Sequence, residues 1–281
     1  MDIVAVLITV AVMSVLGAVL ATALAFAGKI FEVKKDERIE KIIQILPGVN
    51  CGGCGYTGCE KYAEAVVKNG EEVNLCTVGG GQAVDALSVI MGVNAEKKQR
   101  KRAQVMCRGT CEHVKMKYDY VGLDDCFSVS KLGNGPKECR YGCIGLGTCV
   151  KECIFGAIKI KDGLAVVDYD KCRACGVCVN SCPQGIIRLV PYDSSVWVCC
   201  SSGEKAPVTR EVCDTGCIGC GTCKRVCPEN AIELENNVAV IDYSRCTGCG
   251  ICSEKCPRKI ICMKEIRSET DSGKEGDDSD I

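Results

Sequence analysis

The longest apolar stretch of the chain lies at its N-terminus. Ile3 to Ala27 is a run of 25 residues without a charged side chain. A helix rises about 1.5 Å per residue, so this run is long enough to cross a hydrocarbon core of about 30 Å with some tilt. The pattern predicts one transmembrane helix, and we assign residues 1–28 to a membrane anchor.

A cleaved secretory signal is the alternative interpretation of this segment. The small residues from Ala23 to Ala27 would suit a signal peptidase, but no basic residue precedes the apolar run, which is also longer than a usual signal core. Three lysines between residues 29 and 35 follow the run, whereas Asp2 is the only charged residue before it. By the positive-inside rule, we expect a single-pass protein of the cell (inner) membrane with its C-terminal bulk on the cytoplasmic side.

After the anchor, the hydrophobic pattern breaks into short segments. Helical periodicity is found at residues 36–46, 60–68 and 82–91. The basic run at residues 96–102 predicts a solvated linker or the end of a helix, and a surface that attracts an acidic partner is the alternative.

Further along the chain, two pairs of short apolar runs predict β-hairpins. The runs of each pair are separated by a turn, at Asp162-Gly163 in the first pair and at Asn236-Asn237 in the second. Ala165-Val-Val-Asp-Tyr169 matches Ala239-Val-Ile-Asp-Tyr243 at an offset of 74 residues. The sequence therefore predicts a duplicated module.

Cysteine is the most unusual feature of the composition, at 27 of 281 residues. Disulfides are the ordinary explanation, yet the count is odd and the thiols stand two or three residues apart without the spacing of a small disulfide knot. Only 5% of the residues are aromatic, so we expect metal ligation to supply part of the folding free energy. Thiolate ligands need a reducing compartment, which agrees with a cytoplasmic C-terminal part.

Three segments repeat the pattern Cys-x2-Cys-x2-Cys-x3-Cys-Pro, beginning at Cys172, Cys217 and Cys246. This is the spacing with which bacterial ferredoxins hold [4Fe–4S] clusters. In two-cluster ferredoxins, the first three cysteines bind one cluster and the fourth binds its neighbour. We therefore predict coupled pairs of clusters and a role in electron transfer.

A separate cysteine group precedes the repeats. It lies in and after a glycine-rich loop and consists of Cys51, Cys54, Cys59 and Cys76. Glycine suits such a loop because it accepts positive φ angles without strain. Zinc is the alternative here, but all-cysteine zinc sites usually use two Cys-x2-Cys pairs, so the spacing favours a [4Fe–4S] cluster.

The first copy of the duplicated module departs from the repeat. The position that matches Cys220 is Leu146, so one ligand is missing. Cys139 is the expected substitute, because nearby glycines leave its loop flexible. The five predicted ligand sets are Cys51, Cys54, Cys59 and Cys76; Cys139, Cys143, Cys149 and Cys182; Cys153, Cys172, Cys175 and Cys178; Cys217, Cys220, Cys223 and Cys256; and Cys227, Cys246, Cys249 and Cys252.

Seven thiols remain outside these five sets: Cys107, Cys111, Cys126, Cys199, Cys200, Cys213 and Cys262. Most of them flank the start of a module. We consider a sixth cluster held by Cys107, Cys126, Cys199 and Cys213, with unused thiols as the alternative. Cys262 follows two isoleucines and is expected to be a buried thiol.

Other chemistries are not indicated. The net charge of −1 offers no basic surplus for nucleic acid. The sequence has no glycine-rich phosphate loop, so we expect neither a flavin nor a nicotinamide site. His113, the only histidine, is assigned no function. We expect no catalytic residue and no independent active site in this chain, because the cysteines would serve as ligands.

The predicted fold class is α+β. It combines one N-terminal transmembrane helix, a small helical Fe–S domain and two ferredoxin-like βαβ-type di-cluster modules. The expected boundaries are 1–28 for the anchor, 29–95 for the 4Fe–4S domain, 96–138 for a linker with extra cysteines, 139–190 for the first module, 191–212 for a connector, 213–265 for the second module and 266–281 for a disordered acidic tail.

These features together resemble the B subunit of the Rnf ion-translocating electron-transport complex. The similar parts are the membrane helix, Asn50-Cys51-Gly-Gly-Cys54-Gly-Tyr-Thr-Gly-Cys59 with Cys76, and the stretch from Gly135 to Cys149, which is similar to longer family members from anaerobes. The resemblance implies a subunit that exchanges electrons with soluble ferredoxin and relays them to membrane and flavin-bearing subunits. In that family, ferredoxin oxidation with NAD reduction drives Na⁺ or H⁺ across the membrane. A polyferredoxin subunit of a membrane hydrogenase and a non-redox zinc-rich scaffold are the alternatives.

Overall fold

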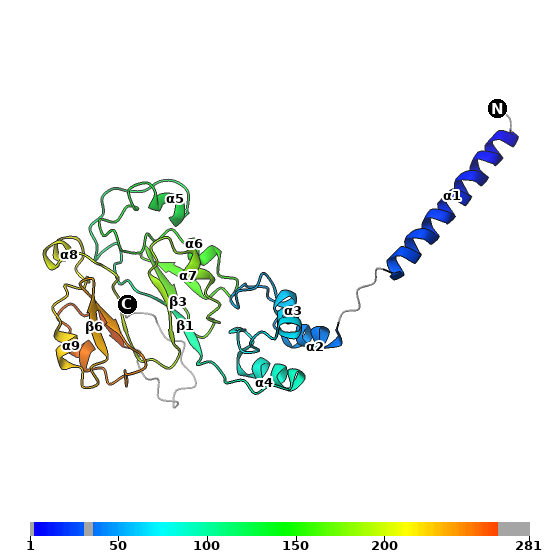
Figure 1. Ribbon diagram of the computed structural model, residues 1–281. Helices are drawn as coiled ribbons and strands as arrows, with labels where there is room; N and C mark the ends of the chain where they lie inside the picture. The colour runs from blue at the N-terminus through cyan, green and yellow to red at the C-terminus, as the bar shows by residue number, and fades with distance from the viewer. Residues whose placement is uncertain (1–2, 31–35, 264–281) are drawn as a thin grey trace, which may run out of the picture.

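The computed structural model describes residues 3–30 and 36–263. The expected acidic tail at 266–281 lies outside these ranges, as do two of the three lysines that follow the apolar run. The first helix, α1 (Ile3–Ile30), is continuous (Figure 1). Its segment Val10–Ala27 has a mean hydropathy of 2.3, and none of that segment is buried within the described chain. By length and composition, α1 could therefore cross a membrane.

Three helices build the domain that follows the anchor: α2 (Glu37–Ile45), α3 (Cys59–Asn69) and α4 (Gly80–Met91). The Asp36 side chain caps α2 by accepting a hydrogen bond from the backbone N–H of Arg38 at 2.9 Å. Ile42, Tyr62 and Leu87 are at most 1% exposed and form one core between the three helices. The amphipathic segments of the sequence thus pack into a small helical domain.

The first ferredoxin-type module contains two antiparallel strand pairs. They are β1 (Lys101–Val105) with β4 (Ile187–Pro191), and β2 (Ile158–Lys161) with β3 (Leu164–Val167). The hairpin forms at the predicted Asp162-Gly163 turn, where both residues have positive φ angles. Three short helices belong to this module: α5 (Cys126–Ser130), α6 (Thr148–Lys151) and α7 (Val177–Ser181).

The second module repeats this arrangement. Its strand pairs are β5 (Val196–Val198) with β8 (Ile261–Met263), and β6 (Ile232–Glu235) with β7 (Val238–Ile241). Its helices are α8 (Ala206–Val212), α9 (Thr222–Val226) and α10 (Ile251–Glu254). Figure 1 shows the two modules side by side, with the helical domain next to the first.

Two strands lie outside the module boundaries expected from the sequence. β1 falls in the predicted linker 96–138 and β5 in the predicted connector 191–212, yet each pairs with the last strand of a module. All pairings of the described strands are antiparallel, so they contain no βαβ-type connection. The reason is that the last strand of each module takes its partner from the segment before the first cysteine motif, which closes the module on itself.

The basic run at residues 96–102 is not wholly solvated. Arg102 is 0% exposed, and its guanidinium carbon lies 3.9 Å from the ring centroid of Tyr169 and 4.6 Å from that of Trp197. Trp197 belongs to β5, so Arg102 packs between the two modules. Stacking on aromatic faces favours a buried guanidinium, which a count of charges along the chain does not reveal.

The apolar cores of both modules are small and include cysteines. In the first module, Cys143, Cys149 and Cys178 are buried together with Ile158 and Ile187. In the second, the buried residues include Cys217, Cys223 and Cys252. Thiol side chains thus occupy space that aliphatic and aromatic residues fill in ordinary cores.

Candidate iron–sulfur centres

The first cysteine group lies where the glycine-rich loop meets α3. Cys51, Cys54, Cys59 and Cys76 line one hollow. The backbone N–H of Cys59 donates to Asn50 Oδ1 at 2.8 Å, and the N–H of Gly79 donates to Cys76 Sγ at 3.3 Å. Burial raises the pKa of Cys76, and the neighbouring thiolates Cys54, Cys59 and Cys51 raise it further. The structure thus brings together all four thiols of this predicted set.

The regular motifs also bring their predicted cysteines together. Cys227, Cys246, Cys249 and Cys252 line one hollow of the second module. Burial raises the pKa of Cys223 to about 11, with further contributions from Cys217, Cys256 and Cys220. In the first module, burial raises the pKa of Cys178 to about 12, and Cys175, Cys172 and Cys153 add to this effect. The fourth cysteine of each set comes from the neighbouring motif, as in a two-cluster ferredoxin.

The irregular set of the first module differs from the one predicted. The hollow beside α6 and α7 is lined by Cys126, Cys143, Cys149 and Cys182. Burial raises the pKa of Cys149 to about 12, and Cys143, Cys126 and Cys182 contribute next. Cys126 therefore lies where the sequence pattern predicted Cys139.

The short helix α5 carries Cys126 to this hollow. Asp125 caps the helix by accepting a hydrogen bond from the N–H of Ser128 at 2.8 Å. Thr148 Oγ1 accepts from the N–H of Cys126 at 2.7 Å and donates to Asp125 Oδ1 at 2.9 Å. These hydrogen bonds hold the start of α5 against the start of α6.

Cys139 belongs to a different hollow, which lies between the two modules. The thiols that line it are Cys107 and Cys139 from the first module and Cys200 and Cys213 from the second, and Cys199 borders it. Burial raises the pKa of Cys139 to about 11, and among its neighbours Cys107 and Cys213 raise it further. Of the tentative sixth set, the structure brings together Cys107 and Cys213, whereas Cys126 lies elsewhere.

Matching hydrogen bonds surround this inter-module set on its two sides. Cys107 Sγ accepts from the N–H of Gly109 at 3.3 Å and from the N–H of Cys143 at 3.5 Å. Cys200 Sγ accepts from the N–H of Ser202 at 3.4 Å and from the N–H of Cys217 at 3.3 Å. Since Cys143 and Cys217 are equivalent in the repeat, the two modules present equivalent faces to the hollow.

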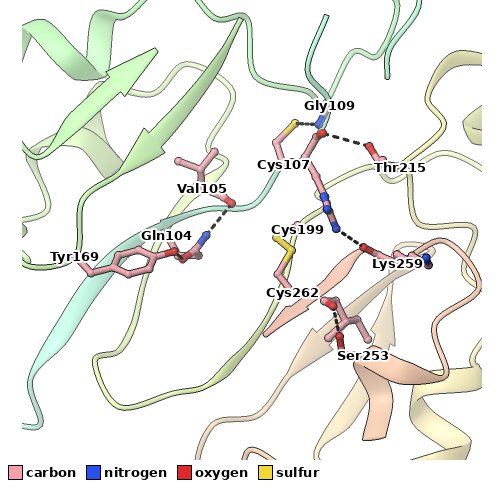
Figure 2. The surroundings of a disulfide bond; sticks show 12 residues. Gln104, Val105, Cys107, Gly109, Tyr169, Cys199, Thr215, Ser253, Lys259 and Cys262 are labelled. Atoms are coloured by element: carbon pink, nitrogen blue, oxygen red, sulfur yellow. Dashed lines mark hydrogen bonds between the residues drawn. A yellow bond between two sulfur atoms is a disulfide. The ribbon is translucent and has the colours of Figure 1, made fainter. Parts of the chain in front are cut away.

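Cys199 and Cys262 form a disulfide bond. Figure 2 shows Cys199 and Cys262 with their surroundings; Cys199 directly follows β5, and Cys262 lies in β8, with which β5 pairs. Cys199 is therefore not a free ligand here, and Cys262 is not the simple buried thiol expected. Cys111 is exposed and belongs to none of the described cysteine groups.

The helical domain contacts the first module beside the loop of Cys175. Thr77 Oγ1 donates to the carbonyl oxygen of Ala174 at 3.3 Å. Gly53 lies so close to this loop that a Cβ in its place would be 2.6 Å from the carbonyl oxygen of Cys175. Because Gly53 and Thr77 each adjoin a cysteine of the first group, two cysteine sets meet at this contact.

The cysteine groups fit an iron–sulfur cluster better than a single metal ion. Within residues 3–30 and 36–263, no group of three or more His, Cys, Asp or Glu side chains is placed to hold one ion. In a cubane each thiolate binds a different iron atom, so the four ligands surround a hollow rather than a point. Backbone N–H groups also donate to sulfur at Cys153, Cys172 and Cys227, and such bonds tune bound clusters.

The repeat contains a signal for the inter-module set. At the offset of 74 residues, Cys139 and Cys213 are equivalent, so both should have the same kind of site. Assigning Cys139 to the irregular set breaks this equivalence, and the structure restores it, because both thiols line one hollow.

The same offset misleads for two other thiols. Cys126 and Cys200 also stand 74 residues apart, yet they line different hollows. By its hydrogen bonds, Cys200 corresponds to Cys107 instead. The reason is that the segment between β1 and Cys143 is longer than the segment between β5 and Cys217, so the offset of 74 does not extend upstream of the motifs.

Family models match three parts of the chain. The model described as "Putative Fe-S cluster" matches residues 46–78. A 4Fe-4S binding domain matches residues 165–188, and a 4Fe-4S dicluster domain matches residues 216–260. These matches cover the helical domain's cysteine loop and parts of both modules.

Relatives of known name cover most of the chain. The B subunit of the Na⁺-translocating ferredoxin:NAD⁺ oxidoreductase complex of Acetobacterium woodii is 44% identical over 86% of this chain and 73% of its own length. The B subunit of the proton-translocating ferredoxin:NAD⁺ oxidoreductase complex of Clostridium ljungdahlii is 40% identical over 85% of each chain. The B subunit of the ion-translocating oxidoreductase complex of Methanosarcina acetivorans is 39% identical over 84% of this chain and 90% of its own. The chain therefore belongs to the family of B subunits of the Rnf-type ion-translocating ferredoxin:NAD⁺ oxidoreductase complexes.

Proposed function

We propose that the chain binds six [4Fe–4S] clusters and is the iron–sulfur electron-transfer subunit of an ion-translocating ferredoxin:NAD⁺ oxidoreductase. The named relatives and the three Fe–S family models support this function. When bound, such clusters accept and donate electrons at potentials that the protein sets. Other subunits of the complex are the expected partners of this chain.

The proposed ligands follow the cysteine groups of the structure. Four sets are those predicted from the sequence: Cys51, Cys54, Cys59 and Cys76; Cys153, Cys172, Cys175 and Cys178; Cys217, Cys220, Cys223 and Cys256; and Cys227, Cys246, Cys249 and Cys252. The irregular set becomes Cys126, Cys143, Cys149 and Cys182. The sixth set becomes Cys107, Cys139, Cys200 and Cys213.

The inter-module set is the observation that carries the relay. It connects to the first module through the N–H of Cys143 and to the second through the N–H of Cys217. At the other end of the first module, the loop of Cys175 contacts the helical domain. Each set thus adjoins the next, which supports one path from the helical domain through both modules.

The second module is the proposed contact for soluble ferredoxin. Cys220 and Cys249 are exposed there. Exposed Lys224 and Arg225 in α9 follow Cys223 and would attract an acidic partner. The helical domain, at the opposite end of the path, is next in the chain to α1 and would deliver electrons to the membrane subunits.

We further propose that α1 anchors the chain with residues 36–263 on the cytoplasmic side of the cell membrane. Thiolate ligands require a reducing compartment, which supports this side. A cysteine-accessibility assay on intact cells and on inverted vesicles tests it. Labelling of an added C-terminal cysteine in intact cells by an impermeant reagent would contradict the proposal.

Metal analysis and EPR on the purified, anaerobic protein test the cluster proposal. Six clusters predict about 24 iron atoms and as many acid-labile sulfides per chain. Reduced ferredoxin should elicit the same EPR signals as dithionite. Zinc in place of iron would favour the zinc-rich scaffold, and iron that ferredoxin cannot reduce would favour a relay with another donor, such as a hydrogenase polyferredoxin.

A further inference from the structure

Lys137 is buried at the inter-module set. It is 3% exposed and lines the same hollow as Cys107, Cys139 and Cys213. Removing an ammonium group from water is costly unless the group is paired with an opposite charge. A buried lysine at this place therefore needs a negative partner.

The protein itself supplies no negative partner within the described residues. Lys137 Nζ donates hydrogen bonds to the carbonyl oxygens of Gly109 and Gly163, both at 2.7 Å. None of the ion pairs among residues 3–30 and 36–263 includes Lys137. The two carbonyl groups hold the ammonium in place but do not neutralise it.

The position of Lys137 relative to the thiols is well defined. Gly109, whose carbonyl accepts from Lys137, also donates its N–H to Cys107 Sγ at 3.3 Å. One peptide segment thus links the ammonium to a ligand of the inter-module set. The equivalent position in the second module is Glu211, which is exposed and lies 3.9 Å from Lys115. The positive charge is therefore present on one side of the hollow only.

We propose that Lys137 is the buried countercharge of the inter-module cluster and keeps its reduction potential above the value it would have without this charge. This inference rests on the proposed function. Four thiolates and an iron–sulfur core carry a net negative charge, and reduction makes that charge larger. A fixed cation in a poorly solvated site stabilises the reduced form more than the oxidised form, so Lys137 acts as a positioning charge rather than a catalytic residue.

Potential-poised EPR titration of the purified full chain tests this role. The inter-module signal is identified as the one that is absent in Cys139→Ala. In Lys137→Gln, whose amide can still donate to a carbonyl, the ratio of reduced to oxidised cluster at a fixed potential should fall about tenfold, a shift of about 59 mV for a one-electron couple. Lys137→Arg keeps the charge and should stay near the wild-type potential.

Lys117→Gln is the matched control. Lys117 Nζ also donates to a carbonyl oxygen, that of Gly133 at 2.8 Å, but its side chain is exposed. Solvent screens an exposed charge, so this substitution should leave the potential unchanged. An equal shift in Lys117→Gln would show a general effect of charge and would overturn the proposal.

Iron content separates the possible failures. A wild-type chain with no inter-module signal would refute the sixth cluster, and with it the proposed function of this set. A wild-type signal whose potential stays the same in Lys137→Gln, at full iron content, would overturn only the role of Lys137. If Lys137→Gln loses the cluster, Lys137→Arg decides: retention of cluster and potential supports the countercharge, and loss of both overturns it.

Discussion

The two ferredoxin-type modules share a frame but complete their cysteine sets in different ways. Their hairpins have the same register, with Ile158 opposite Val167 and Ile232 opposite Ile241. Equivalent N–H groups, those of Ala157 and Ala231, donate to the fourth cysteine of a motif at 3.4 and 3.3 Å. The modules diverge at one ligand position, which is Cys220 in the second and Leu146 in the first.

The first module replaces the missing thiol from outside its motif. Leu146 packs against the group of Cys126, Val129 and Ile144, so the apolar side chain supports the segment that brings the substitute ligand. A ligand position therefore belongs to a hollow in the fold rather than to a place in a motif. Any segment held rigidly over the hollow can supply the thiol.

Removing the equivalent cysteines Cys139 and Cys213 tests the largest consequence of this comparison. Because both line the inter-module hollow, Cys139→Ala, Cys213→Ala and the double variant should each lose about four iron atoms per chain. The sequence-based sets place the two thiols in different clusters, and the double variant would then lose about eight. Iron and sulfide analysis distinguishes these outcomes.

Moving the ligand of the first module back into its motif is the second test. Cys126→Ala should lose about four iron atoms per chain, and adding Leu146→Cys should restore them, because position 146 matches Cys220 in the repeat. Cys111→Ala, at an exposed thiol outside the sets, is the control and should keep all the iron. Full iron content in Cys126→Ala would contradict the assignment.

Two equivalent glycines should differ in their tolerance of a side chain. Gly145 and Gly219 have φ angles of 88° and 61°, so alanine at either costs about 1 kcal/mol of backbone strain. A Cβ at Gly145 would in addition overlap the carbonyl oxygen of Gly163, whereas at Gly219 it would lie 3.0 Å from that of Asn237. We expect Gly145→Ala to lower the thermal midpoint clearly more than Gly219→Ala; equal shifts would argue against the closer approach in the first module.

The smallest expected effect concerns the side-chain cap of α5, since α8 of the second module has no such cap. Hydrogen bonds from Ser128, first from its side chain and then from its N–H, lower the pKa of Asp125 to about 2. The folded pKa lies below the ordinary value of 3.8, so the stabilisation is present above about pH 4 and is lost as the pH falls toward 2. Asp125→Ala should release iron to a chelator several-fold faster at neutral pH, and the difference from the wild type should shrink in acid.

Asp124→Ala is the control for this last prediction. Asp124 precedes the cap, and its backbone carbonyl, rather than its side chain, accepts the hydrogen bond from Lys151. The substitution should leave iron release unchanged. Equal acceleration in both variants would mean that the cap of α5 does not position Cys126.

Much of the candidate site could be predicted because its signals are local. The ligand spacings of the three regular motifs, the glycine-rich loop before Cys59 and the turn at Asp162-Gly163 each lie within a few residues of one another. Short loops allow few conformations, so spacing alone nearly determines which thiols face one another. The apolar run of α1 likewise predicts a helix from composition and length.

The family, the membrane helix and the four regular cysteine groups thus follow from the order of the amino acids. The packing of the folded chain was needed to show that Cys126 replaces the missing ligand, that Cys139 joins Cys200 across the two modules, and that Lys137 is buried beside them. These residues meet through the pairing of β1 with β4 and of β5 with β8, over separations of many tens of residues. Contacts of that range depend on how whole segments pack, and no local spacing records them.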